Sequence, residues 1–178
     1  MRRPDLVPDC GSCDALCCVA TSFEASEDFA VDKSAGVRCP HLTSEHECSI
    51  HDKLIDRGFL GCVLYDCYGA GPTITRRFAG THAELQRNAA FNALRTVHEL
   101  LWQLTEAAKL CPAARADIAT EIAREIERLD AIAQGPTSAL IALDLTAREA
   151  AARASLRRVG EALGGRRPAA HLPVLARD

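Results

Sequence analysis

The chain has 178 residues and a formal net charge of −3 at pH 7, which fits one or two small domains. This near-neutral charge gives no reason to expect a general nucleic-acid or membrane binder. No apolar run approaches the ~20 residues that a membrane span needs. The N-terminus MRRPDLVPDC also lacks the apolar stretch of a signal peptide, so we expect a cytoplasmic protein.

Cysteine is concentrated in the first third of the chain. Eight of the nine cysteines lie before residue 68, and only Cys111 falls outside that segment. Thiols packed this densely form disulfides in a secreted chain but are more often metal ligands in a reducing cytosol. Because we see no signal peptide, we interpret the eight as metal ligands: Cys10, Cys13, Cys17, Cys18, Cys39, Cys48, Cys62 and Cys67.

The opening motif has the spacing C-x2-C-x3-C-C. The Gly and Ser between Cys10 and Cys13 permit a tight turn that directs both thiols towards one metal. If residues 14–20 continue as a helix, Cys13 and Cys17 share a face, and Cys18 lies about 100° further round. We therefore expect Cys13 and Cys17 to share a metal. Cys18 is expected either to reach a second metal or to pack as a small buried hydrophobe.

The other cysteines are spread over residues 39–67. Within them, residues 39–50 are expected as a loose hairpin and residues 50–57 as a short helix capped by Ser49. An imidazole can replace a thiolate as a zinc ligand, and three histidines lie among these cysteines: His41, His46 and His51. Of the three, we expect His51 to face the metal, because it follows a cysteine by three residues in a helical turn.

The donor set leaves two kinds of metal centre open. Structural zinc sites usually come as two C-x-x-C knuckles, and only Cys10 and Cys13 form one here. The closely spaced run of three cysteines is more similar to the ligand pattern of an iron–sulfur cluster, in which three nearby cysteines and a distant fourth bind the cluster. Eight thiolates make two sets of four, or one set of four with the others supporting. We therefore expect an iron–sulfur cluster or zinc.

A glycine-rich break at residues 69–80 separates the cysteine-rich segment from a helical one. The first long helix is expected to begin at a capping box formed by Thr81 and Glu84. Its apolar stripe, at helical spacing, comprises Leu94, Val97, Leu101, Leu104, Ala108 and Cys111. We expect Cys111 to belong to this helical core and not to the metal site.

Two further amphipathic helices follow. The second is expected to end at Gly135-Pro136, and its stripe comprises Ile118, Ile122, Ile126, Leu129 and Ala133. After a short helical piece at residues 138–143, a second capping box, formed by Thr146 and Glu149, is expected to open the third. The stripe of that helix comprises Ala152, Leu156, Val159 and Leu163.

These elements predict a mostly α protein. A small, irregular cysteine-rich metal-binding domain, residues 1–75, is expected to pack on an antiparallel three-helix bundle, residues 81–165. Residues 166–178 are expected to form a flexible tail.

The cysteine spacing is similar to that of the bacterial YkgJ-like cysteine-cluster family. The resemblance covers residues 10–67: C-x2-C-x3-C-C, then Cys39, then C-S-I-H-x5-R-x4-C-x4-C, with all eight cysteine positions present. That family is described as a zinc- or iron-chelating domain, and some relatives are called iron–sulfur-cluster proteins, so the resemblance implies a metal site at these cysteines. This chain departs from it at His51-Asp52 and lacks the proline after Arg57. The whole chain also resembles the N-terminal part of some actinobacterial pentapeptide-repeat proteins, without their repeats.

Three functions fit these features. The favoured one is a non-catalytic module, structural or sensing redox state or metal, whose ~67 residues need a metal to fold. The second is an iron–sulfur-dependent protein-modifying enzyme, since one relative of the family is a flagellin lysine methylase. Against it, the chain has no Gly-rich nucleotide loop, no H-E-x-x-H and no nucleophile constellation. The third is an adaptor with a structural zinc site that binds an unidentified protein partner through the bundle, whose last helix and tail are basic: Arg148, Arg153, Arg157, Arg158, Arg166 and Arg167.

Overall fold

The computed structural model describes residues 4–164, and over that range the protein is helical and has no strand. The prediction of a mostly α protein is therefore confirmed. The expected tail at residues 166–178 lies outside the described residues. Of the helices that are described, none is both long and apolar enough to cross a membrane.

The first part of the chain is built from short helices and loops. Three are single 3-10 turns: Pro4–Leu6, Cys10–Ser12 and His51–Lys53. The others are α1 (Leu16–Ala20), α2 (Leu60–Leu64) and α3 (Ala70–Arg77). The rest of the described chain holds longer helices: α4 (Glu84–Leu110), α5 (Ala116–Gln134), α6 (Thr137–Ile141) and α7 (Leu145–Ala162).

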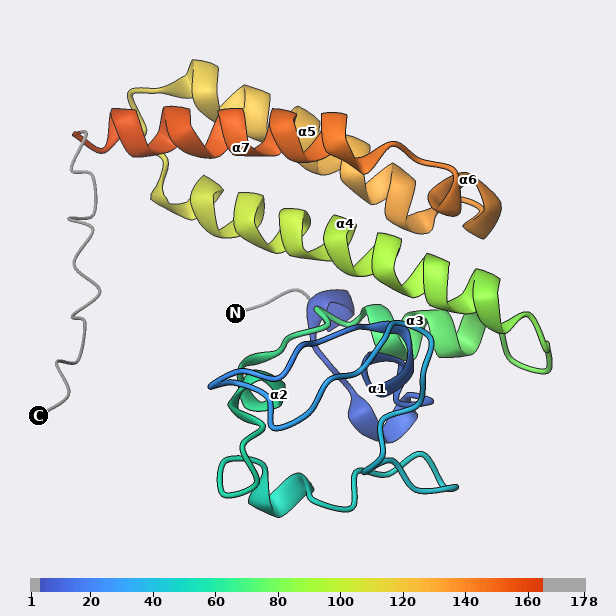
Figure 1. The fold of residues 1–178 in the computed structure, drawn as a ribbon. Coiled ribbons are helices and arrows are strands. Elements are labelled where there is room, and N and C mark those ends of the chain that lie inside the picture. Colours follow the sequence, from blue (N-terminus) through green and yellow to red (C-terminus); the bar gives the residue numbers. More distant parts are fainter. Residues whose placement is uncertain (1–3, 165–178) are drawn as a thin grey trace, which may run out of the picture.

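Helix α4 is the central element of the molecule. It packs on α5, α6 and α7 on one side and on α1 and α3 on the other. Figure 1 shows α5 and α7 alongside α4, each long helix running opposite to the one before it, with the cysteine-rich segment on the far side of α4. One apolar core runs through both layers, from Leu6 and Leu16 across α4 to Val159 of α7. The cysteine-rich segment therefore shares its core with the long helices.

The predicted apolar stripes match the buried faces at most positions, but Ile126 and Leu156 are only partly buried, and their neighbours Glu125 and Ser155 are buried instead. Leu94, Leu101 and Ile122 are fully buried, as the helical spacing predicts. In α4, Ala108 was expected to be buried but is exposed, and Ala107 is buried instead. At that end of the helix, a spacing of three residues from Leu104 keeps the buried stripe facing α5 and α7. In α7, Leu163 is 54% exposed because it lies beyond the last helical residue.

The expected start of the first long helix is wrong. Helix α4 begins at Glu84, and the Thr81 hydroxyl donates to the Phe78 carbonyl at 2.9 Å instead of capping α4. The expected break at residues 69–80 is largely helix α3, which crosses the expected domain boundary at residue 75. Pro72 is tolerated there because it lies in the first turn of α3, where amides have no intrahelical partner.

The second expected capping box is wrong as well. Helix α7 is capped by Asp144, whose carboxylate accepts a hydrogen bond from the Thr146 amide at 2.9 Å. Thr146 therefore lies inside the first turn, and Glu149 pairs with Arg153 one turn later, at 3.3 Å. The aspartate is the better cap because a carboxylate at this position also interacts favourably with the helix dipole.

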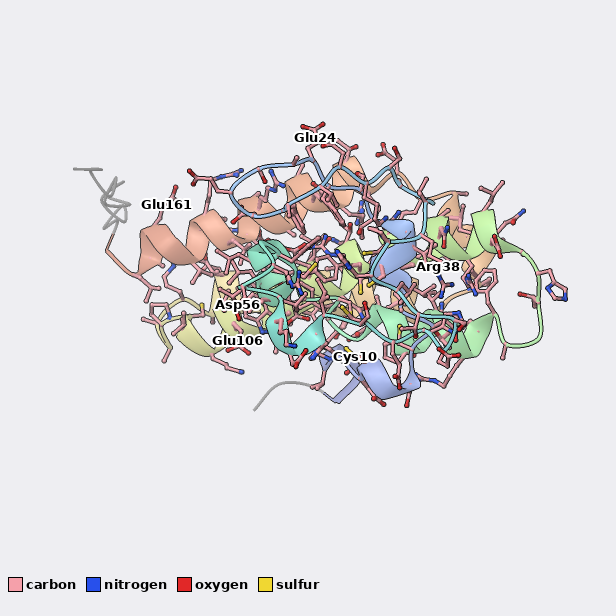
Figure 2. The ribbon with its side chains drawn as sticks, turned by 60° about the horizontal axis from the view of Figure 1, so that its bottom comes forward. Cys10, Glu24, Arg38, Asp56, Glu106 and Glu161 are labelled. Atoms are coloured by element: carbon pink, nitrogen blue, oxygen red, sulfur yellow. The ribbon has the colours of Figure 1, made fainter. Side chains whose placement is uncertain are left out.

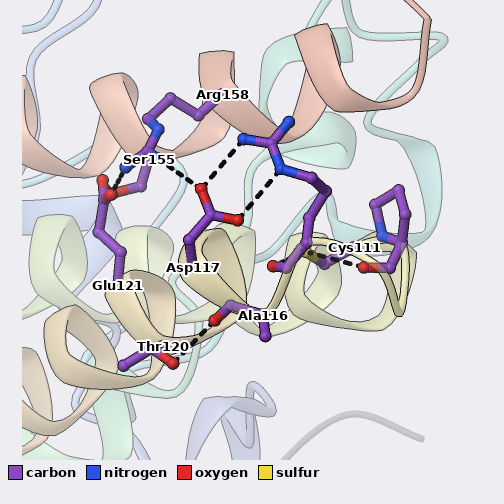
Figure 3. A network of polar contacts seen from close by, with 9 residues as sticks. Cys111, Ala116, Asp117, Thr120, Glu121, Ser155 and Arg158 are labelled. Atoms are coloured by element: carbon purple, nitrogen blue, oxygen red, sulfur yellow. Dashed lines mark hydrogen bonds and ion pairs between the residues drawn. The ribbon is translucent and has the colours of Figure 1, made fainter.

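A polar network joins α5 to α7 (Figure 3). Arg158 of α7 pairs with Asp117 at 3.0 Å and also contacts Glu121 of α5, whose carboxylate accepts a hydrogen bond from Ser155 at 3.0 Å. Arg115 pairs with Asp117 at 3.1 Å. Hydrogen bonds from Arg115, with a further contribution from the charge of Arg158, lower the pKa of Asp117 from 3.8 to about 2.

We expect this network to make stability depend on pH in the acid range. Because the pKa of Asp117 is lower in the folded state, its contribution is complete above pH 3.8 and is lost as pH falls through about 2. Asp117→Asn should remove that part of the dependence. Urea unfolding of both proteins at about pH 5 and about pH 2.5 tests it. An equal loss of unfolding free energy in both proteins contradicts the prediction.

Candidate functional site

The structure gathers the eight N-terminal cysteines around two adjoining cavities, of about 460 Å³ and about 390 Å³. Five of them border both cavities: Cys10, Cys17, Cys18, Cys48 and Cys67. Cys39 and Cys62 border only the larger cavity, and Cys13 borders only the smaller. Cys10 is exposed at the surface (Figure 2). Cys111, in contrast, follows α4 and packs partly buried against the helical core.

The thiols surround these cavities without converging on one point. None of the nine cysteines, all within the described residues, is in a disulfide. Over residues 4–164, no three His, Cys, Asp or Glu side chains are arranged so as to hold a metal ion. The feature that the structure describes is therefore a thiol-lined cavity, and metal binding stays a prediction.

The opening motif is folded differently from the expected helix. Cys13 is extended (φ −130°, ψ 136°) and Ala15 is left-handed (φ 52°), so α1 begins only at Leu16. Cys13 and Cys17 therefore do not share a helix face, although both border the smaller cavity. The thiols of Cys17 and Cys18 do not point apart as expected. A hydrogen bond between them, together with burial, raises the pKa of Cys17.

Contacts with α3 and α4 hold the loop that follows Cys13. The amide of Asp14 donates to the Thr75 hydroxyl of α3 at 3.0 Å, which ties this loop to α3. The Asp14 carboxylate pairs with Arg87 of α4 at 3.4 Å. These long-range contacts offset the cost of the left-handed residue at position 15.

Gly71 of α3 brings two of the sulfurs against the backbone. A Cβ at this position would lie 2.7 Å from the Cys13 Sγ and 3.7 Å from the Cys67 Sγ. The Cys13 sulfur therefore occupies the space that a Cβ would fill, whereas the Cys67 sulfur would be in ordinary van der Waals contact with it.

We expect Gly71→Ala to destabilise the reduced protein by about 1–3 kcal/mol, because the added methyl group must displace the Cys13 thiol. The matched control is Gly160→Ala in α7, where a Cβ meets nothing within 4 Å. That substitution should leave stability unchanged or raise it by up to about 1 kcal/mol. Denaturant unfolding measures both. Equal stability of the Gly71 variant and the wild-type protein contradicts the close packing.

Helix α4 also holds the segment after Cys67. Tyr68 is left-handed (φ 50°); its amide donates to Asp66 Oδ1 at 2.6 Å, and its carbonyl lies 2.7 Å from Nδ1 of His98. His98 is buried on α4, at 3% exposure. Gly69 is left-handed too, and a Cβ there would lie 2.3 Å from a backbone oxygen. The sequence analysis did not single out His98. Its only sequence signal is its position next to the apolar stripe of the first long helix.

Residues 39–58 follow the expected hairpin but not the expected helix. Leu42 and Cys48 form an antiparallel bridge. Only a 3-10 turn, His51–Lys53, forms in place of the helix, and the Ser49 hydroxyl donates to the His41 carbonyl at 3.0 Å instead of capping it. The histidines border the cavities in different ways: His51 both, His41 the larger and His46 the smaller.

An aromatic cluster forms one wall of the larger cavity. The rings of Phe23 and Phe29 stack at 4.3 Å, and Phe59 meets both edge-on. The ring of His41 lies edge-on to Phe59 at 5.1 Å. Phe59 is 2% exposed, so this cluster contributes buried apolar contact to the cysteine-rich segment.

Lys33 places a buried positive charge beside the thiols. It is 5% exposed, and its ammonium group donates to the carbonyls of Val19 at 3.2 Å and Ser34 at 3.3 Å, and to that of Thr21. Burial lowers the pKa of Lys33, while nearby thiols favour its charged form: Cys39, Cys18 and Cys17. Sequence reasoning missed this residue, because an isolated lysine in a loop carries no signal of burial.

Four of the eight thiols have a raised pKa and are shifted towards their protonated form. Burial, followed by the charges of neighbouring thiols, raises the pKa of Cys62 to about 11. The same two causes raise the pKa of Cys10, and burial raises that of Cys13. Without a cation, clustered thiolates would repel one another in a partly buried space. A bound cation would reverse this balance, because thiolate is the form that binds metal.

Comparison with known proteins gives a relative without an assigned role. Over 129 residues, or 68% of the chain, the sequence is 38% identical to the uncharacterized protein YybG of Bacillus subtilis (strain 168). The matched part spans 44% of that relative's length. No family model matches the chain. No solved structure matches it either.

Proposed function

We propose that the thiol-lined cavities bind a metal centre, an iron–sulfur cluster or zinc, and that the protein is a non-catalytic metal-binding module. One observation carries the proposal: cysteines from distant parts of residues 10–67 all gather around the same two cavities, while Cys111 packs elsewhere. Soft thiolate ligands select zinc and iron–sulfur clusters over harder cations.

Two further features fit such a centre. Gly71 leaves room for the Cys13 sulfur directly against the backbone, which suits a bulky inorganic group. The Tyr65 hydroxyl is buried without a hydrogen-bond partner on a side chain that borders the larger cavity, and a metal-bound sulfur is an acceptor for it. Because the thiols do not converge, binding requires their side chains to rotate inwards.

The proposal includes a finer architecture. A cysteine-rich domain, residues 1–75, would be folded by its metal and packed on an antiparallel three-helix bundle of α4, α5 and α7. Its support is that α4 contacts both layers and that the two layers share one apolar core. The resemblance of residues 10–67 to the YkgJ-like family agrees with this assignment. Such a module would be structural or would sense metal or redox state, because thiolate ligands are readily oxidised.

The test is a metal and acid-labile sulfide analysis of protein purified without oxygen, with a visible spectrum. Iron with sulfide and a brown colour supports an iron–sulfur cluster, and a colourless zinc protein supports zinc. Cys111→Ser should keep the metal, and Cys17→Ser should lose it. Protein that takes up neither iron with sulfide nor zinc after reduction and reconstitution contradicts the proposal.

A further inference from the structure

A third, polar cavity lies between the loop that follows α1 and helix α4. Its volume is about 300 Å³, and none of the described residues that line it is a cysteine. It adjoins the larger thiol-lined cavity, because three residues line both: Thr21, Ser22 and Tyr65. Helix α4 forms the opposite wall with Asn92, Arg95 and Thr96. This cavity is therefore a neighbour of the thiols with different chemistry.

Arg95 supplies the charge of this cavity. Among the described residues that line it, Arg95 is the one with an ionised side chain. Its guanidinium carbon lies 5.4 Å from the centre of the Tyr65 ring, and its Nη2 pairs with Glu99 one helical turn later, at 3.1 Å. These two contacts fix the guanidinium group before any ligand arrives, which lowers the entropic cost of binding.

Part of the guanidinium group lacks a partner. The Arg95 Nε is buried and has no hydrogen-bond partner in the described part of the chain. An unpaired buried donor costs about 1–3 kcal/mol, and more when it is charged, so such groups are nearly always paired with protein, water or a ligand. The Arg95 side chain is 30% exposed, so an acceptor can approach the guanidinium group from the cavity.

The polar neighbours of Arg95 differ in whether they can turn to a ligand. The hydroxyls of Thr21 and Thr96 already donate to backbone carbonyls, at 2.6 Å and 3.2 Å. The side-chain amide of Asn92 donates to the Ala20 carbonyl only at 3.5 Å, which is long for a hydrogen bond. Asn92 is therefore the second donor that a ligand in this cavity can recruit.

The charges around the cavity indicate which acceptor fits. Lys33 is buried behind the Thr21 wall, where its ammonium group donates to the Thr21 carbonyl. Lys33 and Arg95 against Glu99 leave a surplus of one positive charge. One carboxylate balances that surplus, whereas a phosphate group carries close to two negative charges at pH 7. A planar carboxylate also matches the flat guanidinium group.

We propose that this cavity binds a small molecule through its carboxylate group, with Arg95 as the main binding residue and Asn92 beside it. A volume of about 300 Å³ is at the lower end of ligand pockets, which suits a small carboxylic acid. The inference goes beyond the proposed function and does not depend on which metal the thiols bind.

The test is saturation-transfer NMR of the methyl protons of sodium acetate, added to the full chain purified without oxygen. Acetamide is the matched probe, because it has nearly the same shape and no charge. We expect the acetate signal to saturate in roughly the millimolar range, as suits so small a probe, and acetamide to give no signal. Sodium chloride at the same ionic strength should leave most of the acetate signal.

Arg95→Gln should abolish the acetate signal, because it removes the charge and the unpaired donor. The matched control is Arg153→Gln. Arg153 of α7 also pairs with a glutamate four residues away, Glu149, at 3.3 Å, and lines none of the three cavities. This variant should bind acetate as the wild-type protein does.

Three outcomes overturn the inference: equal signals from acetate and acetamide, loss of the acetate signal in sodium chloride, and acetate binding that survives in Arg95→Gln. Displacement of acetate by sodium phosphate at a concentration below that of acetate overturns the choice of a carboxylate. The comparison of the two probes needs no variant, so it decides even where Arg95→Gln does not fold. Acetate binding by a chain that takes up no metal contradicts the proposed function alone.

Discussion

We expect that removing the proposed metal will unfold the cysteine-rich segment and leave the long helices folded. Within residues 10–67 few apolar side chains are buried, among them Leu16, Leu42 and Phe59. Apart from the few side chains that join the core shared with α4, this segment buries little apolar surface, which does not hold a segment of this size in water. Structural zinc contributes about 10–16 kcal/mol in small domains, which makes metal binding and folding one event. The long helices keep their own buried stripes.

Amide hydrogen exchange of the metal-loaded full chain, before and after addition of a chelator, measures this. Protection should be lost over residues 10–67 and kept at the centre of α4 and in α5, which serve as the internal control. Unchanged protection in the cysteine-rich segment contradicts a metal that folds it. Loss of protection across α4 and α5 contradicts the independence of the long helices.

The helices were predictable because their signal is local. The buried positions Leu94, Leu101 and Ile122 follow from a period of 3.6 residues, which depends on neighbours within a few turns. Helix ends were less predictable because several polar residues near each end compete to cap it. The residue that caps α7 is Asp144, two residues before the threonine of the expected capping box.

For the cysteine-rich segment, the sequence predicted which cysteines gather together but not how they are arranged in space. The eight thiols border shared cavities, but which of them are neighbours depends on long-range contacts that spacing does not encode. Cys39 bonds Cys18 through the backbone, 21 residues earlier in the chain. The expected opening helix is interrupted at Ala15, which is left-handed and lies in a loop that Asp14 ties to Thr75, 61 residues away. Lys33 and His98 were missed for the same reason, since only the folded chain buries them.

The second large effect is expected at Phe91, a side chain of α4 that belongs to the shared apolar core. Phe91 is fully buried and borders the smaller cavity, so its ring packs against the core on one side and lies near the thiols on the other. Truncating a buried phenylalanine removes its apolar contacts and leaves a void that neighbours fill only in part. Phe91→Ala should therefore lower the free energy of unfolding by about 3–5 kcal/mol.

Leu85→Ala is the matched control, because Leu85 lies on the same helix and is 82% exposed. It should change stability by no more than about 0.5 kcal/mol. Urea unfolding of the metal-loaded proteins, followed by far-UV circular dichroism, measures both variants. A loss below about 1 kcal/mol at Phe91 contradicts its place in a shared core.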